Sequence, residues 1–344
     1  MKTIDKDNMF QSIWDFPENI IDALKISEEI KIKNDYENVN KVIVAGMGGS
    51  AIGGDVVNSL IKEDINIPFI VNRGYNLPAW VDSSTLIICS SYSGNTEETL
   101  SILEKANSIN AKVIGITTGG KLETLCGKYD YDKVLIPSGL QPRAALAFSF
   151  IPLLCVLKKV GVINTDIEPW LHSAAKLIKS KRIEYSENEG KNPVWALANK
   201  IYSKLPIIYA DSDGLDTVAI RLKGQICENS KILAYHNIYP EMNHNEIVGW
   251  HNNAEYFSNY FVLWVMDKDM NERNKSRQSI ISNILSNLKV KQEIIEVEGD
   301  GFKERFLLLI HYGEWLSYWC AIMHNTDPSP VKNIQVLKNK LSKI

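Results

Sequence analysis

The segment TLIICSSYSGNTEETLSILEKANS, residues 85–108, decides the fold class. It opens on a continuous apolar run, passes through a turn that contains Gly94, and enters a stretch rich in helix formers. A continuous rather than alternating apolar run is typical of a parallel strand that is covered on both faces of its sheet. Strand, turn and helix in this order predict one unit of an α/β fold.

The same order of elements recurs on both sides of this segment. Further strands are expected at KVIVAG (41–46), PFIVN (68–72), KVIGIT (112–117), KVLIP (133–137), LPIIYA (205–210), KILAYH (231–236), YFVLWVM (260–266) and EIIEVE (293–298). The chain of 344 residues is longer than one compact core usually organises. We therefore expect an α/β fold with two doubly wound parallel-sheet subdomains, each in three α/β/α layers. Their expected ranges are 1–162 and 196–344, with a helical connector at 163–195.

The composition argues against several classes of protein. Charged residues make up 23%, the net charge is −3, and no basic run stands out, which argues against nucleic-acid binding. The N-terminus lacks the apolar core of a secretion signal. The most apolar stretch, 144–162, carries Pro152 and is short for a membrane span, so a buried helix is expected there. The five cysteines form no CxxC pair and are interpreted as free thiols in a cytoplasmic protein.

The turn after the decisive strand carries three hydroxyl side chains, Ser91, Ser93 and Thr96, around Gly94. The N-terminus of a helix carries partial positive charge and unsatisfied N–H donors, which suit a phosphate group. An ordinary helix cap would use one such hydroxyl. Three within six residues, at the carboxyl end of a parallel strand, favour a phosphate site.

A second glycine-rich turn, GMGGSAIGGD at 46–55, also follows a strand and opens a helix. It partly satisfies the dinucleotide fingerprint GxGxxG, and Arg73 after the next strand could suit the 2′-phosphate of NADP. That interpretation, an NADP-dependent reductase, leaves the first turn unexplained. A single sugar phosphate held by both turns, with Gly49 and Ser50 contributing, explains the two together.

Acid–base candidates gather in the second half of the chain. They are Glu228 in CENSK, and Glu241, His244 and Glu246 in PEMNHNEIVGW. Glu228 is expected near the end of a helix, where a carboxylate opposes the helix dipole. The polar neighbours of His244, Glu246 among them, could orient its imidazole.

Two further features concern charged ligands. The histidines around His244 lack the helical HExxH spacing and have no cysteine beside them, so no metal site is expected. Arg143 follows Pro142, which fits the first position of the long apolar helix. An Arg at the positive end of a helix is unfavourable unless an anion lies nearby. The alternative is a surface Arg whose stem covers apolar side chains.

The motifs together resemble one family. GMGGSAIGGD, SYSGNTEET, PSGLQPRAA, CENSK, PEMNHNEIVGW and DPSPVKNIQVLK occur in the order found in the bacterial and archaeal bifunctional phosphoglucose/phosphomannose isomerases, of the sugar isomerase (SIS) domain superfamily. The resemblance covers nearly the whole chain. It implies two SIS-type subdomains and interconversion of glucose 6-phosphate, and of mannose 6-phosphate, with fructose 6-phosphate, as in glycolysis and gluconeogenesis.

The resemblance also implies roles for individual residues. Gly49, Ser50, Ser91, Ser93 and Thr96 would bind the 6-phosphate. The base that moves a proton between C1 and C2 would be Glu228, and Arg143 would stabilise the enediolate. His244 would assist ring opening from the other subunit of a homodimer, and Lys338 would take part from the terminal helix. Ser329 is the candidate for the small hydroxyl residue that admits the mannose epimer. Neither a cofactor nor a metal is implied.

One alternative to an enzyme stays open, a SIS-type regulator that binds a sugar phosphate without turning it over. Such a protein would need the two hydroxyl turns but not Glu228, His244 and Arg143, whose presence therefore favours the isomerase. A regulator linked to nucleic acid would also usually carry a helix-turn-helix or a basic region, and the sequence shows neither.

Overall fold

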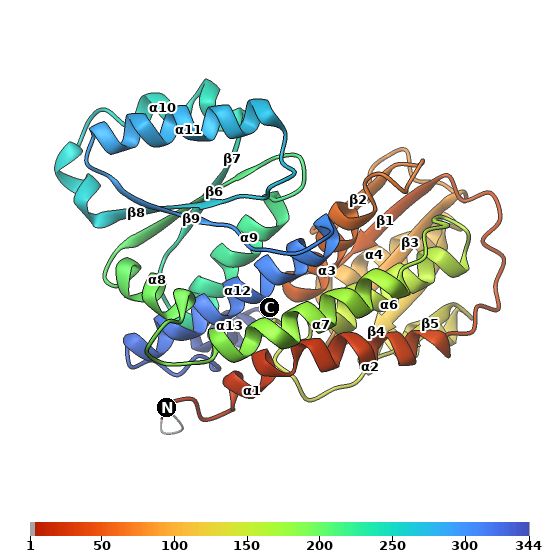
Figure 1. Ribbon diagram of the computed structural model, residues 1–344. Helices are drawn as coiled ribbons and strands as arrows, with labels where there is room; N and C mark the ends of the chain where they lie inside the picture. The colour runs from red at the N-terminus through yellow and green to blue at the C-terminus, as the bar shows by residue number, and fades with distance from the viewer. Residues whose placement is uncertain (1–3, 344) are drawn as a thin grey trace. The chain divides into compact units, whose positions relative to one another are not determined.

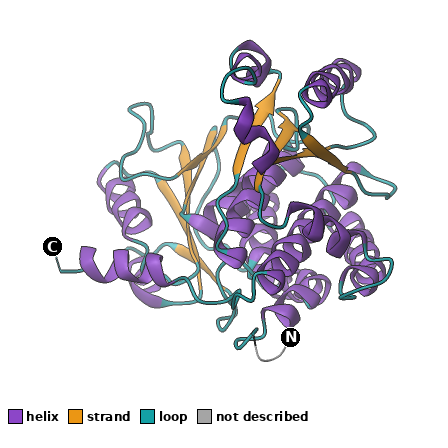
Figure 2. Cartoon of the chain, turned by 90° about the vertical axis from the view of Figure 1, so that its left-hand side faces the viewer, coloured by secondary structure: helices purple, strands orange, loops and turns teal. Residues whose placement is uncertain are grey.

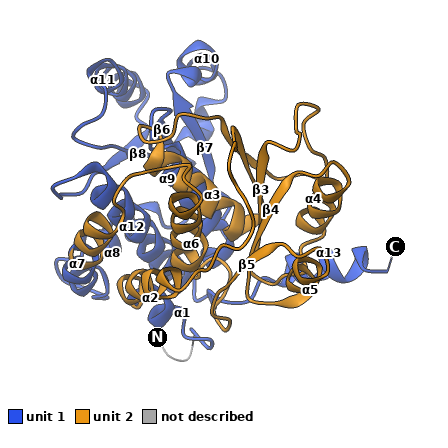
Figure 3. Ribbon diagram, turned by 90° about the vertical axis from the view of Figure 1, so that its right-hand side faces the viewer, with its two compact units in different colours: residues 1–14, 177–344 blue, residues 15–176 orange. Residues whose placement is uncertain are grey.

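The computed structural model describes residues 4–343 and divides the chain into two compact units (Figure 3). Unit 2 comprises residues 15–176, which are contiguous in sequence. Unit 1 comprises residues 1–14 together with residues 177–344, so the beginning and the end of the chain fold into one body. A helical connector at 163–195 between two SIS subdomains stays a prediction.

Unit 2 is built on a sheet of five parallel strands in the order β2-β1-β3-β4-β5 (Figure 1). The strands are β1 (Lys41–Ala45), β2 (Phe69–Asn72), β3 (Thr85–Ser91), β4 (Lys112–Thr117) and β5 (Asp132–Leu135). The chain runs from β1 to β2 on one side and then from β3 to β5 on the other, so the winding reverses between β1 and β3. In open α/β sheets, ligands bind at the carboxyl ends of the two strands that flank such a reversal.

Helices cover both faces of the unit 2 sheet (Figure 3). They are α2 (Phe16–Glu28), α3 (Gly48–Ile61), α4 (Glu97–Ser108), α5 (Gly120–Lys128), α6 (Leu146–Lys159) and the first part of α7 (Glu168–Tyr185). The apolar helix α6 packs on α2 and α3 and is buried from Leu146 to Leu157, as expected from its sequence. Among residues 4–343, none of the helices combines the length and the apolar character that a membrane crossing requires.

Unit 1 contains four parallel strands in the order β7-β6-β8-β9. They are β6 (Leu205–Asp211), β7 (Tyr235–Tyr239), β8 (Tyr260–Val265) and β9 (Lys291–Ile295). The strand expected at 231–236 is therefore wrong in its bounds, since β7 begins only at Tyr235. Lys231 adopts the left-handed conformation, with φ 58° and ψ 30°, and turns the chain before extended backbone can begin.

Helices lie on both sides of this second sheet as well (Figures 1 and 2). The helices of unit 1 are α1 (Met9–Trp14), α8 (Pro193–Ile201), α9 (Asp216–Gln225), α10 (Glu246–Gly249), α11 (Glu272–Asn287), α12 (Phe302–Met323) and α13 (Lys332–Leu341), of which α13 has no buried residue. Helix α12 is buried along most of its length and packs on α8, α9 and α1. Phe10 of α1 meets the rings of Trp315 and Tyr318 edge-on, at centroid distances of 5.0 and 5.7 Å, and so anchors the start of the chain to α12.

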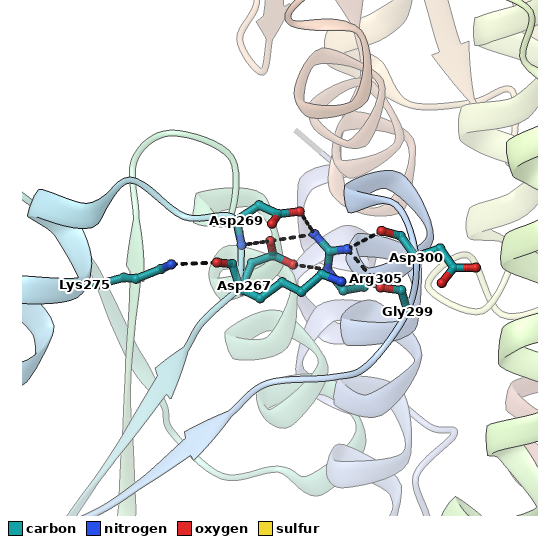
Figure 4. Close-up of polar contacts among 7 residues, drawn as sticks. Asp267, Asp269, Lys275, Gly299, Asp300 and Arg305 are labelled. Carbon is teal, nitrogen blue, oxygen red and sulfur yellow. Dashed lines mark hydrogen bonds and ion pairs between the residues drawn. The ribbon is translucent and has the colours of Figure 1, made fainter.

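The winding of the unit 1 sheet also reverses, between β6 and β8. A loop follows the carboxyl end of the strand after each reversal, β3 in unit 2 and β8 in unit 1. In unit 1 this loop carries Asp267 and Asp269, and both accept hydrogen bonds from the buried guanidinium of Arg305 (Figure 4). The remaining Arg305 donors reach the carbonyl oxygens of Gly299 and Asp300, at 3.0 and 2.9 Å. All five N–H groups of Arg305 therefore have acceptors within the unit, which makes this cluster structural.

Candidate functional site

The glycine-rich turn after β1 places Ser50 in the first turn of α3. Gly48 begins that helix with φ +51°, in the left-handed region that favours glycine. The Ser50 hydroxyl is largely buried and accepts a hydrogen bond from the backbone N–H of Tyr92 at 3.2 Å. Since Tyr92 lies in the turn after β3, this bond joins the two candidate phosphate turns directly.

The hydroxyl groups of the SYSGNT turn do not serve as helix caps. Thr96 occupies the N-cap position of α4, but its side chain makes no capping hydrogen bond. Its hydroxyl instead lies 2.8 Å from the Ser91 hydroxyl, and Ser93 Oγ accepts from the backbone N–H of Asn95. The ordinary-cap interpretation is therefore wrong, because the Thr96 hydroxyl at the N-cap faces Ser91 and makes no capping bond.

Gly94 lets this turn press against the loop that follows β4. It has φ +67°, and a Cβ atom placed there would lie 1.8 Å from the carbonyl oxygen of Gly119. The backbone N–H of Thr118 donates to Tyr92 O, and Leu122 N–H donates to Gly94 O. Backbone hydrogen bonds from the segment after β4 thus hold the hydroxyl-bearing turn in place.

A third segment, the QPR turn, reaches the same edge of the sheet. A Cβ atom on Gly49 would lie 2.6 Å from Pro142 O and 3.6 Å from Arg143 N, so the two segments touch. The backbone N–H of Leu140 donates to the Tyr92 hydroxyl at 3.1 Å. The candidates Gly49, Ser50, Ser91, Ser93, Thr96 and Arg143 therefore lie on three mutually contacting segments of unit 2.

The structure corrects the position expected for Pro142 and excludes the alternative given for Arg143. Helix α6 begins at Leu146, and Pro142 lies before it, in a turn in which Ala144 N–H donates to Gln141 O. Arg143 is only 5% exposed, so it is no surface side chain. The Arg143 backbone contacts the glycine-rich turn at Gly49, and a largely buried guanidinium is suited to hold an anion.

The structure argues against the NADP interpretation, because Arg73, the residue assigned to the 2′-phosphate, is already paired with a carboxylate. The Arg73 guanidinium forms an ion pair with the Asp55 carboxylate, which lies in the same unit on α3. The cation that the NADP interpretation assigned to a 2′-phosphate is therefore already neutralised by a side chain of the glycine-rich segment itself.

The candidate base in unit 1 lies near the end of a helix, as expected. Glu228 falls within a π-helical turn, Ile226–Ser230, that continues α9. Isolated π turns are frequent at functional sites, because the wider turn redirects side chains. Two buried neighbours fix this turn to α12: Asn229 Nδ2 donates to Ser317 Oγ at 2.9 Å, and Ser230 Oγ donates to Ser317 O at 2.7 Å.

Lys231 closes the end of the π-helical turn. Its ammonium donates to the carbonyl oxygens of Glu228, Asn229 and Pro328, at 2.7, 3.2 and 2.9 Å. A cation is favourable at the carboxyl end of a helix, where carbonyl groups lack intrahelical partners. The contact also ties the Glu228 backbone to the DPSP segment near the end of the chain.

Glu228 opens onto a cavity of about 560 Å³ in unit 1. The cavity is lined by Cys227, Glu228, Lys231, Ile232, Leu233, Thr326, Asp327, Pro330, Val331, Lys332, Asn333 and Ile334. Ser329 is not among these residues, and its side chain is buried at 1% exposure. Thr326, which the sequence did not single out, is the hydroxyl residue that shares the cavity with Glu228.

His244 and Lys338 are both exposed in unit 1. His244 ends a 3₁₀ turn, Glu241–His244, that follows β7, and Lys338 lies on α13. Within residues 4–343, no three or more His, Cys, Asp or Glu side chains are grouped so that they could hold a metal ion.

Sequence reasoning missed three residues that hold the candidates in place: Tyr92, Lys231 and Ser317. Tyr92 and Lys231 lie inside quoted motifs and could have been found there by asking what each polar side chain bonds. Burial raises the pKa of the Tyr92 hydroxyl, which keeps it protonated. Ser317 lies in an apolar stretch of α12 and carries no local signal.

Comparison with known proteins identifies the family of the chain. The family described as SIS domain matches residues 35–138, and the family described as bacterial phospho-glucose isomerase C-terminal SIS domain matches residues 190–341. A bifunctional phosphoglucose/phosphomannose isomerase of Caldicellulosiruptor bescii is 42% identical over 98% of this chain and 99% of its own length. The chain belongs to the bifunctional phosphoglucose/phosphomannose isomerase family.

Other relatives support the family and the fold. The Aquifex aeolicus member of this isomerase family is 36% identical, with 91% of this chain and 93% of its own length covered. A solved structure of a hypothetical protein from Thermus thermophilus superimposes with a TM-score of 0.76 at 12% identity, over 98% of this chain and 90% of that one. The prediction of two SIS-type α/β/α subdomains with parallel sheets is confirmed.

Proposed function

We propose that this protein is an aldose–ketose isomerase that interconverts glucose 6-phosphate, and also mannose 6-phosphate, with fructose 6-phosphate. The observation that carries the proposal is the meeting of three segments of unit 2 at the reversal of the sheet. They carry the hydroxyl groups of Ser50, Ser91 and Thr96 and the buried Arg143, whose backbone contacts Gly49. Hydroxyl groups, a guanidinium and a helix N-terminus together form a suitable site for a phosphorylated sugar.

The proposed mechanism is proton transfer through a cis-enediol. Glu228 removes the proton from C2 of the open-chain aldose and returns it to C1, while the hydroxyl proton moves from O2 to O1. The C2 proton is only weakly acidic, so the enediolate formed by its removal needs a nearby positive charge. Arg143 supplies this charge, with help from Lys338. The 6-phosphate lies far from C1 and C2, and its binding energy positions these carbons against the base.

The proposal includes a homodimer in which His244 is supplied by the partner subunit. Helix α13 supports this, because within the described residues none of its side chains is buried. Its apolar side chains Ile334, Val336, Leu337 and Leu341 are 41 to 58% exposed. Covering an amphipathic helix of this kind with a second copy removes apolar surface from water. We place the enzyme in the cytoplasm, where it would serve glycolysis and gluconeogenesis.

The test is a coupled assay on purified protein treated with EDTA, with fructose 6-phosphate and then mannose 6-phosphate as substrate. We expect turnover of both sugars, and loss of nearly all turnover in Glu228→Gln with sugar-phosphate binding retained. The double variant Ser93→Ala, Thr96→Ala should raise KM strongly. Binding without turnover in the wild-type protein would favour the regulator instead, and near-normal turnover in Glu228→Gln would remove the base assignment.

A further inference from the structure

The segment between β7 and β8 that carries His244 is attached to the core by the buried side chains of Met242 and Trp250 and by one carboxylate that bonds to two strands. We name residues 240–250 the His244 loop. Glu246 lies on α10 within this loop, two residues after His244. Its carboxylate accepts hydrogen bonds from the hydroxyl of Tyr209, from the hydroxyl of Tyr235 at 2.9 Å, and from the side-chain amide of Asn237.

The three donors come from two neighbouring strands. Tyr209 lies on β6, while Tyr235 and Asn237 lie on β7, which pairs in parallel with β6. Glu246 is partly buried, so these bonds form at the boundary between the core and solvent. A carboxylate that accepts three hydrogen bonds from two rigid strands is held far more tightly than an exposed side chain of an ordinary loop.

The far end of the loop is attached to the same hydroxyl group. The indole N–H of Trp250 donates to Tyr209 Oη at 3.2 Å, and both side chains are buried. Burial together with the Glu246 carboxylate raises the pKa of Tyr209 far above its ordinary value, so the hydroxyl remains a donor to Glu246. Tyr209 therefore connects two points of the loop, Glu246 and Trp250, to the centre of the sheet.

These contacts change the interpretation of Glu246 given by the sequence. The sequence suggested that Glu246 orients the imidazole of His244. In the structure its carboxylate oxygens face Tyr209, Tyr235 and Asn237, so Glu246 acts on the backbone of the loop. The imidazole itself is exposed, two residues before this attachment.

We infer that Glu246 is a positioning residue that holds the His244 loop in the geometry required for sugar-ring opening. The inference rests on the role proposed for His244. A displacement of about 1 Å in a catalytic group can cost a hundredfold in rate. Removal of the carboxylate should therefore lower kcat at least tenfold, while KM, set by the phosphate segments of unit 2, should change less than threefold.

The experiment is a double-mutant cycle on the full-length protein, with fructose 6-phosphate as substrate. The variants are Glu246→Ala, His244→Asn and their combination, and Glu255→Ala removes an exposed carboxylate nearby as the matched control. We expect the combined variant to be no slower than His244→Asn alone, within twofold, because Glu246 acts through His244. Glu246→Gln keeps one acceptor oxygen and should recover part of kcat.

Each other outcome has a definite meaning. If the two substitutions multiply their effects in the combined variant, or if Glu246→Ala retains full kcat, the inference is overturned. If His244→Asn is as active as wild type, the role of His244 fails and the inference falls with it. Absence of isomerase activity in the wild-type protein instead overturns the proposed function.

A milder variant guards against a folding failure. If Glu246→Ala is insoluble, Tyr235→Phe removes one donor to the same carboxylate at an exposed position. It should lower kcat two- to fivefold in the wild-type background and not at all with His244→Asn. An equal reduction in both backgrounds would contradict the inference.

Discussion

Gly94 and Gly48 form a matched pair that tests whether the SYSGNT turn binds the substrate phosphate. Both have positive φ, +67° and +51°, and each lies in one of the two glycine-containing turns of unit 2. They differ in the space around them. A Cβ atom at Gly94 would lie 1.8 Å from Gly119 O, whereas nothing lies within 4 Å of a Cβ atom at Gly48.

The magnitudes follow from this difference. Alanine in the left-handed conformation costs about 1–2 kcal/mol at either position. At Gly48 that is the whole cost, so Gly48→Ala should lose about 1–2 kcal/mol of stability and change KM less than about threefold. At Gly94 the added methyl group must also separate two backbone segments by more than about 1 Å, and a displacement of that size costs about a hundredfold in kcat/KM.

The assay measures initial rates with fructose 6-phosphate, together with the inhibition constant of inorganic phosphate. Relative to Gly48→Ala, the variant Gly94→Ala should lower kcat/KM about a hundredfold and should weaken the binding of inorganic phosphate by a similar factor. Thermal melts of both variants show whether unit 2 remains folded. Equal KM and equal phosphate inhibition in the two variants would refute the reasoning, because the turn would then have no part in binding.

The remaining predictions concern unit 1. Arg305→Met leaves the Asp267 carboxylate buried without its cation. Urea titration should therefore show a loss of about 3–5 kcal/mol in the free energy of unfolding. A loss under about 1 kcal/mol would contradict a buried ion pair. Lys231→Gly relieves a left-handed residue but removes three contacts to carbonyl oxygens, so kcat should fall while the melting temperature changes little. An unchanged kcat would make Lys231 a simple helix cap. Cys227 is partly exposed in the Glu228 cavity, and the other four cysteines are buried. A thiol reagent should therefore modify Cys227 first, and fructose 6-phosphate should slow this modification. Labelling of a buried cysteine before Cys227 would argue against this cavity.

The sheets could be predicted from the sequence because their strands are continuous apolar runs. The range 112–117 was predicted to the residue, since Lys112–Thr117 is bounded by a turn on either side. The strand predicted at 231–236 has the wrong bounds, because Lys231 at its start adopts the left-handed conformation. The apolar residues that follow give no sign of this conformation, which contacts of the Lys231 side chain stabilise. Backbone conformations of this kind depend on distant partners, here Pro328, that a local pattern does not contain.

The candidate site divides in the same way. The meeting of the two candidate turns of unit 2 could be predicted, because both follow parallel strands and the carboxyl ends of such strands meet at one edge of the sheet. The use of Glu246 could not, since its partner Tyr209 lies 37 positions away and reads as an ordinary strand residue. The sequence likewise gives no sign that Ser317 holds the turn around Glu228, because both bonds cross between helices.

The division of the chain between its two units has a consequence for protein synthesis. Residues 15–176 are complete as soon as they leave the ribosome, so unit 2 can fold while translation continues. Unit 1 must wait, because Phe10 finds Trp315 and Tyr318 only after nearly the whole chain has been made. During that interval the N-terminal segment and the growing strands of the second sheet lack their buried partner helix. The nascent chain should therefore be most exposed to chaperones and proteases in the time between synthesis of β6 and synthesis of α12.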